Sequence, residues 1–211
     1  MAHQNKFNFS EWLMQTPMPE GKRKIIQASV KLFAQRGYQA TTTAAIAQEA
    51  GMSDATMFKY FKSKQALLDA IIMPLIEEMI PTLTANFADT LSEQSTSIDD
   101  LIAYFIADRY AFVEQNYQLV LILLNQLLVD SKLRSKVIMQ LEPNLQKILQ
   151  VLQRLLATDP QVAANWQASD VLQLIASQLL TQFICHRTLN LSTNDQQVNK
   201  LITLVQHALR P

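Results

Sequence analysis

The stretch from residue 42 to residue 61 restricts most strongly what this chain can fold into. Gly51 separates two short segments, and the hydroxyl side chains of residues 41–43 and of Ser53 can cap a helix at the start of each. Ala47 is small enough for two helices to cross closely, and the glycine that follows it permits a tight turn between them. The pattern predicts a helix-turn-helix over residues 42–61.

The apolar residues of this stretch predict which side of its second helix faces inward. At about 100° per residue from Asp54, Met57 and Phe61 fall on one face. The opposite face then carries Ala55, Thr56, Lys59 and Tyr60. A helix with such an outer face can enter the major groove of double-stranded DNA, so we expect these side chains to lie near base edges.

The remainder of the chain has the sequence pattern of helices. Only three glycines occur, and the strand-favouring runs bounded by tight turns that mark hairpins are missing. A basic amphipathic segment at residues 20–36 precedes the motif, and Gly37 ends it. We therefore expect an all-α fold, with an N-terminal three-helix domain that contains the helix-turn-helix and a larger helical bundle after it.

Helix signals after the motif give the expected domain division. Ser63 can cap a helix that starts at Lys64 and continues to about Leu91, with a kink at Pro74. Further helices are expected at residues 97–116, 117–130, 131–158, 168–190 and 195–209. The expected organisation is an N-terminal arm at 1–19, a domain with the helix-turn-helix at 19–79 and a helical bundle at 80–211. The family resemblance given below implies that the second part is a DNA-binding domain and the third an effector-binding and dimerisation domain.

The charges of the chain sum to zero but are unevenly distributed. Residues 1–64 contain nine Lys and Arg against four Asp and Glu, and the remainder contains nine against fourteen. A basic N-terminal segment followed by an acidic one favours an N-terminal domain that faces a polyanion. Chance clustering of the charges is the alternative interpretation.

Several classes of protein receive no support from the sequence. Cys185 is the single cysteine and no secretory leader pattern opens the chain, so we expect a soluble, cytoplasmic protein. The most apolar stretch, Leu119–Val129, is too short to cross a bilayer, so no membrane partner is expected. Nothing in the sequence has the spacing of a catalytic nucleophile and base, a phosphate-binding glycine loop or a metal cluster, so we expect no enzyme, no cofactor and no metal.

A wider set of residues around the motif is similar to a known family. Residues 20–68 combine the basic helix, a Thr-rich start of the next helix, the helix-turn-helix and a Ser-Lys pair that opens the following helix. The residues that carry the similarity are Phe33, Gly37, Ile46-Ala47, Ala50-Gly51-Met52-Ser53, Thr56, Phe58, Tyr60-Phe61, Ser63-Lys64 and Ala66-Leu67-Leu68. The pattern closely resembles the TetR family of bacterial repressors.

This resemblance implies a homodimer that binds a palindromic or near-palindromic operator in double-stranded DNA. In that family the third helix enters the major groove, and the starts of the second and fourth helices contact phosphates. Carried over to this chain, Thr43 and Lys64 would hold phosphates, which agrees with the affinity of helix N-termini for anions. The residues expected to bind DNA are Thr43, Ser53, Ala55, Thr56, Lys59, Tyr60 and Lys64.

Two residues depart from the pattern of the family. Phe58 stands where the family usually has a tyrosine whose hydroxyl reaches a phosphate, so one backbone contact is missing. Ala55 stands where the family often has glycine, and its methyl group can contact a thymine methyl or narrow the set of tolerated bases. We expect the departures to affect operator affinity and to leave the fold unchanged.

The C-terminal part gives weaker functional signals. Asn125 is a candidate effector ligand because a buried amide needs hydrogen-bond partners, with exposure or a bond to a neighbouring helix as the alternative. Tyr104 and Asp108 are candidates to line an effector pocket, with packing in the core as the alternative. We expect the unknown small-molecule effector to be largely apolar.

The last two expected helices carry more apolar residues than a single buried face requires. Broad apolar faces of this kind are typical of a four-helix interface between two subunits. The residues expected at this dimer interface are Leu172, Ile175, Leu179, Phe183, Val198, Leu201 and Val205.

Together these expectations describe a sequence-specific transcriptional regulator. The favoured version is a repressor that a largely apolar small molecule releases from its operator. The alternative is a DNA-binding dimer that a protein partner controls without a small-molecule effector.

Overall fold

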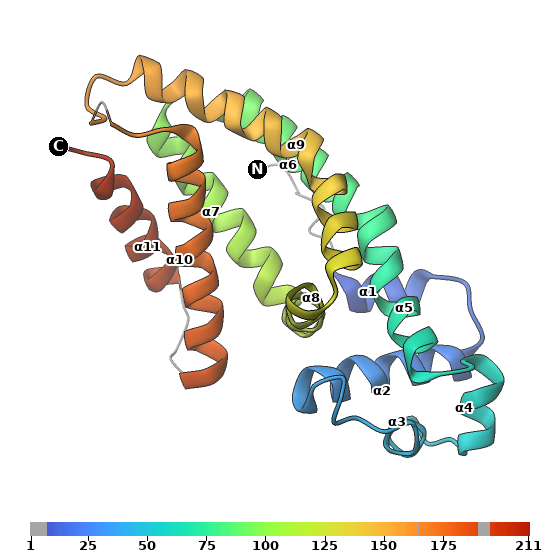
Figure 1. The fold of residues 1–211 in the computed structure, drawn as a ribbon. Helices are drawn as coiled ribbons and strands as arrows, with labels where there is room; N and C mark the ends of the chain where they lie inside the picture. Colours follow the sequence, from blue (N-terminus) through green and yellow to red (C-terminus); the bar gives the residue numbers. More distant parts are fainter. Residues whose placement is uncertain (1–7, 164, 190–194) are drawn as a thin grey trace. The chain divides into compact units, whose positions relative to one another are not determined.

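The computed structural model describes residues 8–163, 165–189 and 195–211 of the chain. All regular structure within these ranges is helical, which confirms the predicted fold class (Figure 1). The elements are α1 (Phe9–Gln15), α2 (Glu20–Arg36), α3 (Thr43–Glu49), α4 (Asp54–Tyr60), α5 (Lys64–Pro74), the π-helix η1 (Leu75–Met79), α6 (Ile80–Gln94), α7 (Ile98–Gln115), α8 (Tyr117–Val129), α9 (Ser131–Thr158), α10 (Ala168–Leu189) and α11 (Asp195–Ala208).

The helices form two compact units. The N-terminal unit comprises Met1–Pro81 and Gln115–Gln140, and the C-terminal unit comprises Thr82–Glu114 and Leu141–Pro211. The end of the first segment lies close to the boundary expected after residue 79. However, α8 and the first part of α9 group with the N-terminal helices, because α8 packs against α2.

The N-terminal unit begins with α1, in a segment that the sequence marks only as an arm. The side chain of Asn8 caps this helix by accepting hydrogen bonds from the backbone N–H groups of its first turn. Leu13 is buried, and the guanidinium of Arg23 on α2 donates to the backbone oxygens of Leu13 at 3.0 Å and Thr16 at 2.9 Å. These bonds occupy carbonyl groups at the end of α1 and fix it to α2.

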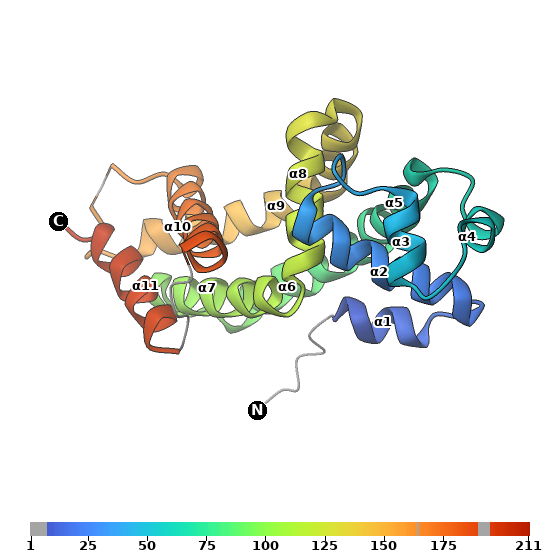
Figure 2. The same ribbon diagram turned by 90° about the horizontal axis from the view of Figure 1, so that it is seen from below.

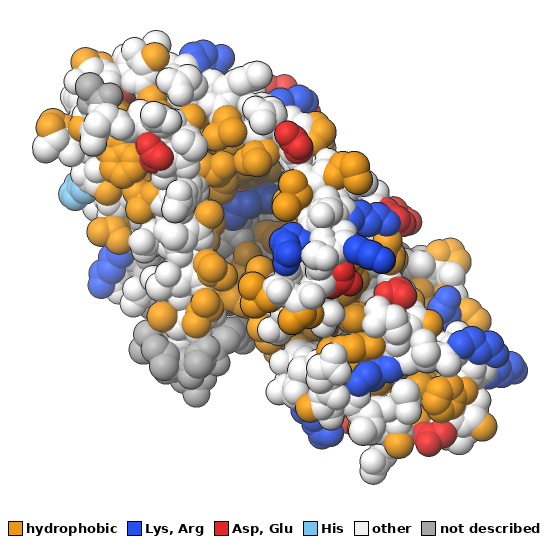
Figure 3. Space-filling model, viewed as in Figure 1, with side chains coloured by type: hydrophobic (Ala, Val, Ile, Leu, Met, Phe, Trp, Pro, Cys, Tyr) orange, Lys and Arg blue, Asp and Glu red, His pale blue; other side chains and the backbone are white. Residues whose placement is uncertain are grey.

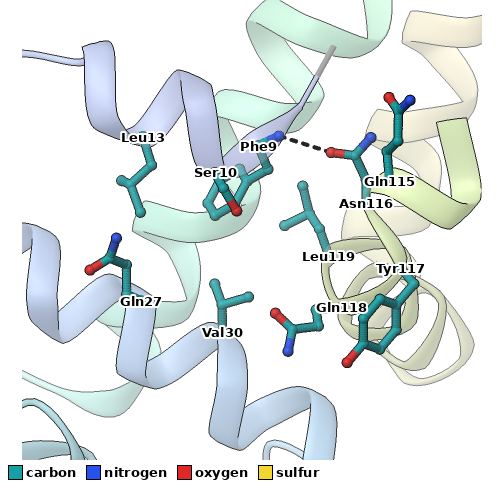
Figure 4. A pocket seen from close by; sticks show the side chains of 10 residues that line it. All are labelled: Phe9, Ser10, Leu13, Gln27, Val30, Gln115, Asn116, Tyr117, Gln118 and Leu119. Atoms are coloured by element: carbon teal, nitrogen blue, oxygen red, sulfur yellow. Dashed lines mark hydrogen bonds between the residues drawn. The ribbon is translucent and has the colours of Figure 1, made fainter. Parts of the chain in front are cut away.

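A second contact holds the start of α1. Asn116, directly before α8, is buried, and its Oδ1 accepts a hydrogen bond of 2.8 Å from the backbone N–H of Phe9. A cavity of about 420 Å³ lies beside this bond between α1, α2 and α8 (Figure 4). Its walls carry apolar and uncharged polar side chains, among them Gln27 and Gln118. The first helix is therefore an integral part of the N-terminal unit.

The long helix expected from Lys64 to about Leu91 is divided where Pro74 interrupts its hydrogen-bond ladder. Pro74 ends α5, and the π-helix η1 follows it directly. Within η1 the backbone N–H of Ile80 donates to the oxygen of Leu75, five residues earlier. A proline has no N–H to donate, and a π-helical turn accommodates the resulting change of register without ending the helix.

The C-terminal unit has its own apolar core, to which α6, α7, α9, α10 and α11 contribute. Fully buried residues such as Leu101, Leu152 and Val171 bring three of these helices together. Figure 2 shows α10 and α11 side by side within this unit. Arg210, after α11, forms ion pairs with Asp99 at 2.6 Å and with Asp159 at 3.1 Å. The larger helical domain that the sequence predicts is thus present.

Candidate nucleic-acid interface

The turn between α3 and α4 has the geometry that the sequence predicts. Gly51 adopts a φ of 67°, a conformation that a residue with a side chain rarely adopts. The backbone N–H of Met52 donates to the oxygen of Ala47 at 2.8 Å, and Ala47 is 1% exposed. The small side chain and the left-handed glycine allow the two helices to cross closely, as the helix-turn-helix requires.

The start of α3 lies among the three threonines that the sequence offers as caps. Thr42 caps the helix, because its hydroxyl accepts a hydrogen bond of 3.2 Å from the backbone N–H of Ala45. Thr43 is the first helical residue and is half-buried. Thr41 is buried, and its hydroxyl donates to the oxygens of Gly37 and Leu32. Of the three threonines, Thr42 is therefore the exposed hydroxyl at this helix terminus.

The inner and outer faces of α4 lie as the sequence predicts. Met57 is fully buried and Phe61 is 4% exposed, whereas Ala55 and Lys59 are exposed and Thr56 is half-buried. The hydrophobic core of the N-terminal unit therefore holds one face of α4 and leaves the other accessible. That accessible face is the part of this helix that can reach DNA.

Ser53 and Tyr60 of the expected DNA-binding set have structural contacts. The hydroxyl of Ser53 caps α4 by accepting a bond of 3.2 Å from the backbone N–H of Thr56. Tyr60 is half-buried, and a Cβ placed on Gly21 of α2 would lie 3.0 Å from its hydroxyl oxygen. Gly21 therefore permits α2 and the end of α4 to approach closely, a role that the sequence pattern does not show.

Lys64 has more hydrogen-bond partners than any other expected DNA-binding residue. Its Nζ donates to the backbone oxygens of Tyr38 at 2.9 Å, Gln39 at 3.3 Å and Thr41 at 3.0 Å. The same atom lies 4.5 Å from the centroid of the Tyr38 ring. Burial raises the pKa of the Tyr38 phenol, and Asp69 adds to this effect, so the hydroxyl that donates to Gln65 stays neutral. The ammonium of Lys64 thus faces the protein backbone.

Basic side chains gather near α4 and the start of α5. Figure 3 shows Lys and Arg side chains on the surface at this end of the N-terminal unit. Lys59 and Lys62 are exposed there, and Lys22 on α2 is half-buried with its Nζ 5.6 Å from the Phe61 ring. Lys62 was not among the expected contacts, although its position directly before the Ser63 cap could have indicated it.

The three expected effector residues do not share one unit. Tyr104 stacks on Phe87 at 5.5 Å, and Asp108 pairs with Arg109, in the C-terminal unit. Asn125 belongs to α8 of the N-terminal unit, where it is exposed and donates to the backbone oxygen of Leu121. The residues therefore have local partners, and an effector contact by any of them stays a prediction.

The residues expected at the dimer interface lie mainly inside the C-terminal unit. Ile175, Leu201 and Val205 belong to its buried core, Phe183 is buried, and Leu172, Leu179 and Val198 are partly buried against that core. The exposed apolar side chains of the same two helices are different ones, Leu180, Ile184 and Leu204, with exposed fractions of 46%, 50% and 56%. A dimer interface on α10 and α11 would therefore be formed by these exposed side chains.

No helix among the described residues is long and apolar enough to span a membrane. Within the same part of the chain, no group of three or more His, Cys, Asp or Glu side chains is arranged to hold a metal ion.

The short helices α3 and α4, their tight turn and the accessible outer face define a helix-turn-helix protein. Residues 25–71 match the model of the family described as bacterial regulatory proteins, tetR family. The N-terminal segment of this chain is therefore similar to the DNA-binding domain of the TetR family.

Individual relatives extend this comparison. The uncharacterized HTH-type transcriptional regulator YvkB of Bacillus subtilis is 46% identical over 54 residues, 26% of this chain and 28% of the relative. The HTH-type transcriptional repressor KstR2 of Mycolicibacterium smegmatis is 25% identical over 108 residues, 50% of this chain and 51% of that protein. The chain thus matches about half, or less, of the length of these curated relatives.

A solved structure covers more of the chain. FadR of Bacillus subtilis in complex with stearoyl-CoA superposes with a TM-score of 0.57 over 86% of this chain and 96% of that one, at 20% identity. At that identity the superposition shows that the overall fold is shared.

Proposed function

We propose that the chain is a dimeric repressor that binds an operator through α3 and α4 and is released by a small molecule with a largely apolar body. The observation that carries the proposal is the arrangement of α4, with Met57 in the core and Lys59 and Ala55 accessible on the other side. A rigid helix with one polar, accessible face has the dimensions and chemistry to read base edges in the major groove.

The proposed contacts divide into those that position the protein and those that read the sequence. The N-terminus of α3, with the exposed hydroxyl of Thr42 and the neighbouring Thr43, offers backbone N–H groups and hydroxyls to a phosphate. The exposed Lys62 offers a charge to the same backbone. Thr56 and Lys59 on α4 are the proposed contacts to bases.

Dimerisation through α10 and α11 supports operator binding, because two half-sites bind far more tightly than one. Leu180, Ile184 and Leu204 expose apolar surface that a partner subunit could cover. A two-fold interface of this kind matches a palindromic operator.

The proposed effector has an apolar body, as does the stearoyl-CoA bound to the FadR neighbour. In the C-terminal unit the ring of Phe87 packs against those of Tyr104 and Phe105, with centroids 5.5 and 4.8 Å away. The guanidinium of Arg109 lies 4.2 Å from the centroid of the Phe87 ring. An aromatic cluster next to a cation suits a ligand with an apolar chain and an anionic head group, which would replace Asp108 as the partner of Arg109.

Control by a protein partner remains the second candidate, because the exposed Leu128 and Val129 at the end of α8 have exposed fractions of 80% and 78%. Such a pair of exposed apolar side chains offers a contact surface to another protein. The two candidates differ in whether a small molecule alone changes operator affinity.

The test is selection of an operator from random DNA with the purified chain, followed by fluorescence anisotropy on the selected duplex. We expect a palindromic or near-palindromic site and weaker binding in the presence of stearoyl-CoA or a shorter acyl-CoA. Coenzyme A without the acyl chain is the matched control. Failure to enrich any sequence would contradict the DNA-binding proposal, and release only by a protein fraction would favour the second candidate.

A further inference from the structure

The side chain of Lys64 connects two parts of the helix-turn-helix domain that are separated in the sequence. Lys64 is the first residue of α5, directly after the Ser63 cap. Its Nζ lies 2.9, 3.3 and 3.0 Å from the backbone oxygens of Tyr38, Gln39 and Thr41. An ammonium group has three N–H donors, so three acceptors account for its whole donor capacity.

The three acceptors belong to the segment that sets the start of α3. This segment runs from Gly37, which has a φ of 81°, to Thr41, whose buried hydroxyl donates to the Gly37 oxygen at 2.8 Å. Thr42 follows immediately and caps α3. The position of residues 38–41 therefore determines where the N-terminus of α3 lies. Lys64 holds that segment by donating to three of its backbone oxygens.

We propose that Lys64 is a positioning residue, whose ammonium fixes residues 38–41 and thereby the phosphate-binding start of α3, and that it does not itself bind a phosphate. The inference rests on the proposed DNA-binding function. It reassigns a residue that the sequence pattern places among the phosphate contacts.

The surroundings of the ammonium support this role. To reach a phosphate, Nζ would have to leave three backbone oxygens and the face of the Tyr38 ring, which attracts a cation. The carbonyl groups of residues 38 and 41 would then lose a charged donor. Lys62 is exposed two residues earlier in the same turn and can meet a phosphate at no such cost. The positive charge available to DNA at this turn is therefore that of Lys62.

The first test compares Lys64→Met with Lys62→Met, because methionine keeps an unbranched apolar stem and removes the charge. Operator affinity is measured over a series of salt concentrations. We expect Lys64→Met to weaken binding by about tenfold, the loss typical of a charged hydrogen-bonding group, and to leave the log-log salt slope unchanged. Lys62→Met should reduce the slope by about 0.9 for each subunit, which is about 2 for a dimer. A slope reduced by Lys64→Met as much as by Lys62→Met would overturn the proposal.

A second measurement uses the unaltered protein, and its main comparison is made without DNA. The full-length protein, with and without operator, receives a short pulse of acetic anhydride. Mass spectrometry then identifies which lysines are acetylated. Lys64 should react more slowly than Lys62 and Lys59 in the free protein, with no further protection on DNA. Equal rates for the three lysines in free protein would contradict the contact with residues 38–41. If the protein binds no DNA, the proposed function fails. The acetylation rates in free protein still show whether Lys64 contacts residues 38–41.

A double-mutant cycle separates positioning from general stability. Thr42→Ala removes the cap of α3 directly, and Lys64→Met acts on the same helix start through residues 38–41. We expect the losses in operator affinity of these two variants to be non-additive, whereas Lys64→Met and Lys59→Ala should add. Additive losses for Lys64 and Thr42 would show that Lys64 acts on DNA binding by another route.

Discussion

Replacement of Asn116 by alanine tests whether α1 is a fixed part of the N-terminal unit. Asn116 is 3% exposed, and its Oδ1 accepts the backbone N–H of Phe9, which is 6% exposed. In Asn116→Ala the backbone N–H of Phe9 loses its acceptor, at a buried site where water has little access. A buried donor left without a partner costs about 1–3 kcal/mol, so the free energy of unfolding should fall by about 2 kcal/mol.

The chain provides both a control and a reporter for this experiment. Asn125→Ala changes the same residue type on the neighbouring helix α8, but Asn125 is exposed, so a change within about 0.5 kcal/mol is expected. Trp12 lies on α1 and stacks on Phe9, with ring centroids 5.5 Å apart. In a Trp166→Phe background its fluorescence reports on α1 alone, since the chain has two tryptophans.

Urea unfolding of both variants at one fixed protein concentration gives the comparison, because the stability of a dimer depends on concentration. The Trp12 signal of Asn116→Ala should change at lower urea than that of Asn125→Ala. Coincident transitions for the two variants would refute the reasoning, since the buried hydrogen bond would then contribute no more than an exposed one.

Three further predictions address DNA reading, assembly and pH. Thr56→Val and Lys59→Ala should each cost about 1–3 kcal/mol per base contact on the selected operator, and less on a duplex with the contacted pair changed, as measured by anisotropy. Leu180→Glu should halve the mass from light scattering, whereas Leu128→Glu, on an exposed residue of the other unit, should leave it unchanged. The pKa of Asp159 is lowered, first by a backbone hydrogen bond and then by a neighbouring guanidinium. Its ionised form therefore stabilises the fold above the unfolded pKa of about 3.9, and this contribution is lost as the pH falls through the lower pKa of the folded state. In Asp159→Asn the melting temperature should therefore fall less steeply below about pH 4.

The helix-turn-helix was predictable because its determinants are local. Gly51 and Ala47 fix the turn through backbone conformation and side-chain size, both of which the sequence states directly. The spacing of Met57 and Phe61 then decides which face of α4 is buried, because a helix repeats every 3.6 residues or so. The domain that these residues define was found where the pattern placed it.

The helix α1 was not predictable in the same way. Its seven residues are too few to form a stable helix alone, so its existence depends on tertiary contacts. Arg23 supplies one of these contacts from α2, and Asn116 supplies another from 107 residues away. A lone asparagine between two helices gives no sequence signal that it holds a distant backbone N–H.

Apolar periodicity also could not say which face of α10 packs within the subunit. The helix has two apolar stripes, one with Ile175 and Leu179 and the other with Leu180 and Ile184. Both have the spacing of a buried face, and the choice between them depends on where α7 and α11 lie. The structure buries the first stripe and exposes the second, so the surface available to a partner subunit is the stripe that periodicity alone could not select.

Lys64 shows why a motif can locate a residue and still leave the partner of its side chain open. The pattern Ser63-Lys64 identifies the start of a helix, and helix starts bind anions, so a phosphate is the natural partner to expect. A lysine side chain, however, has a flexible stem of four carbons, so its ammonium can turn to any acceptor within reach. Here the backbone oxygens of Tyr38, Gln39 and Thr41 accept from the ammonium, in a turn that Gly37 and the Thr41 hydroxyl shape. In the proposed positioning role the charge of Lys64 acts on the protein, whereas in the role that the motif predicts it acts on a phosphate. The salt slope of Lys64→Met is the quantity that distinguishes the two roles.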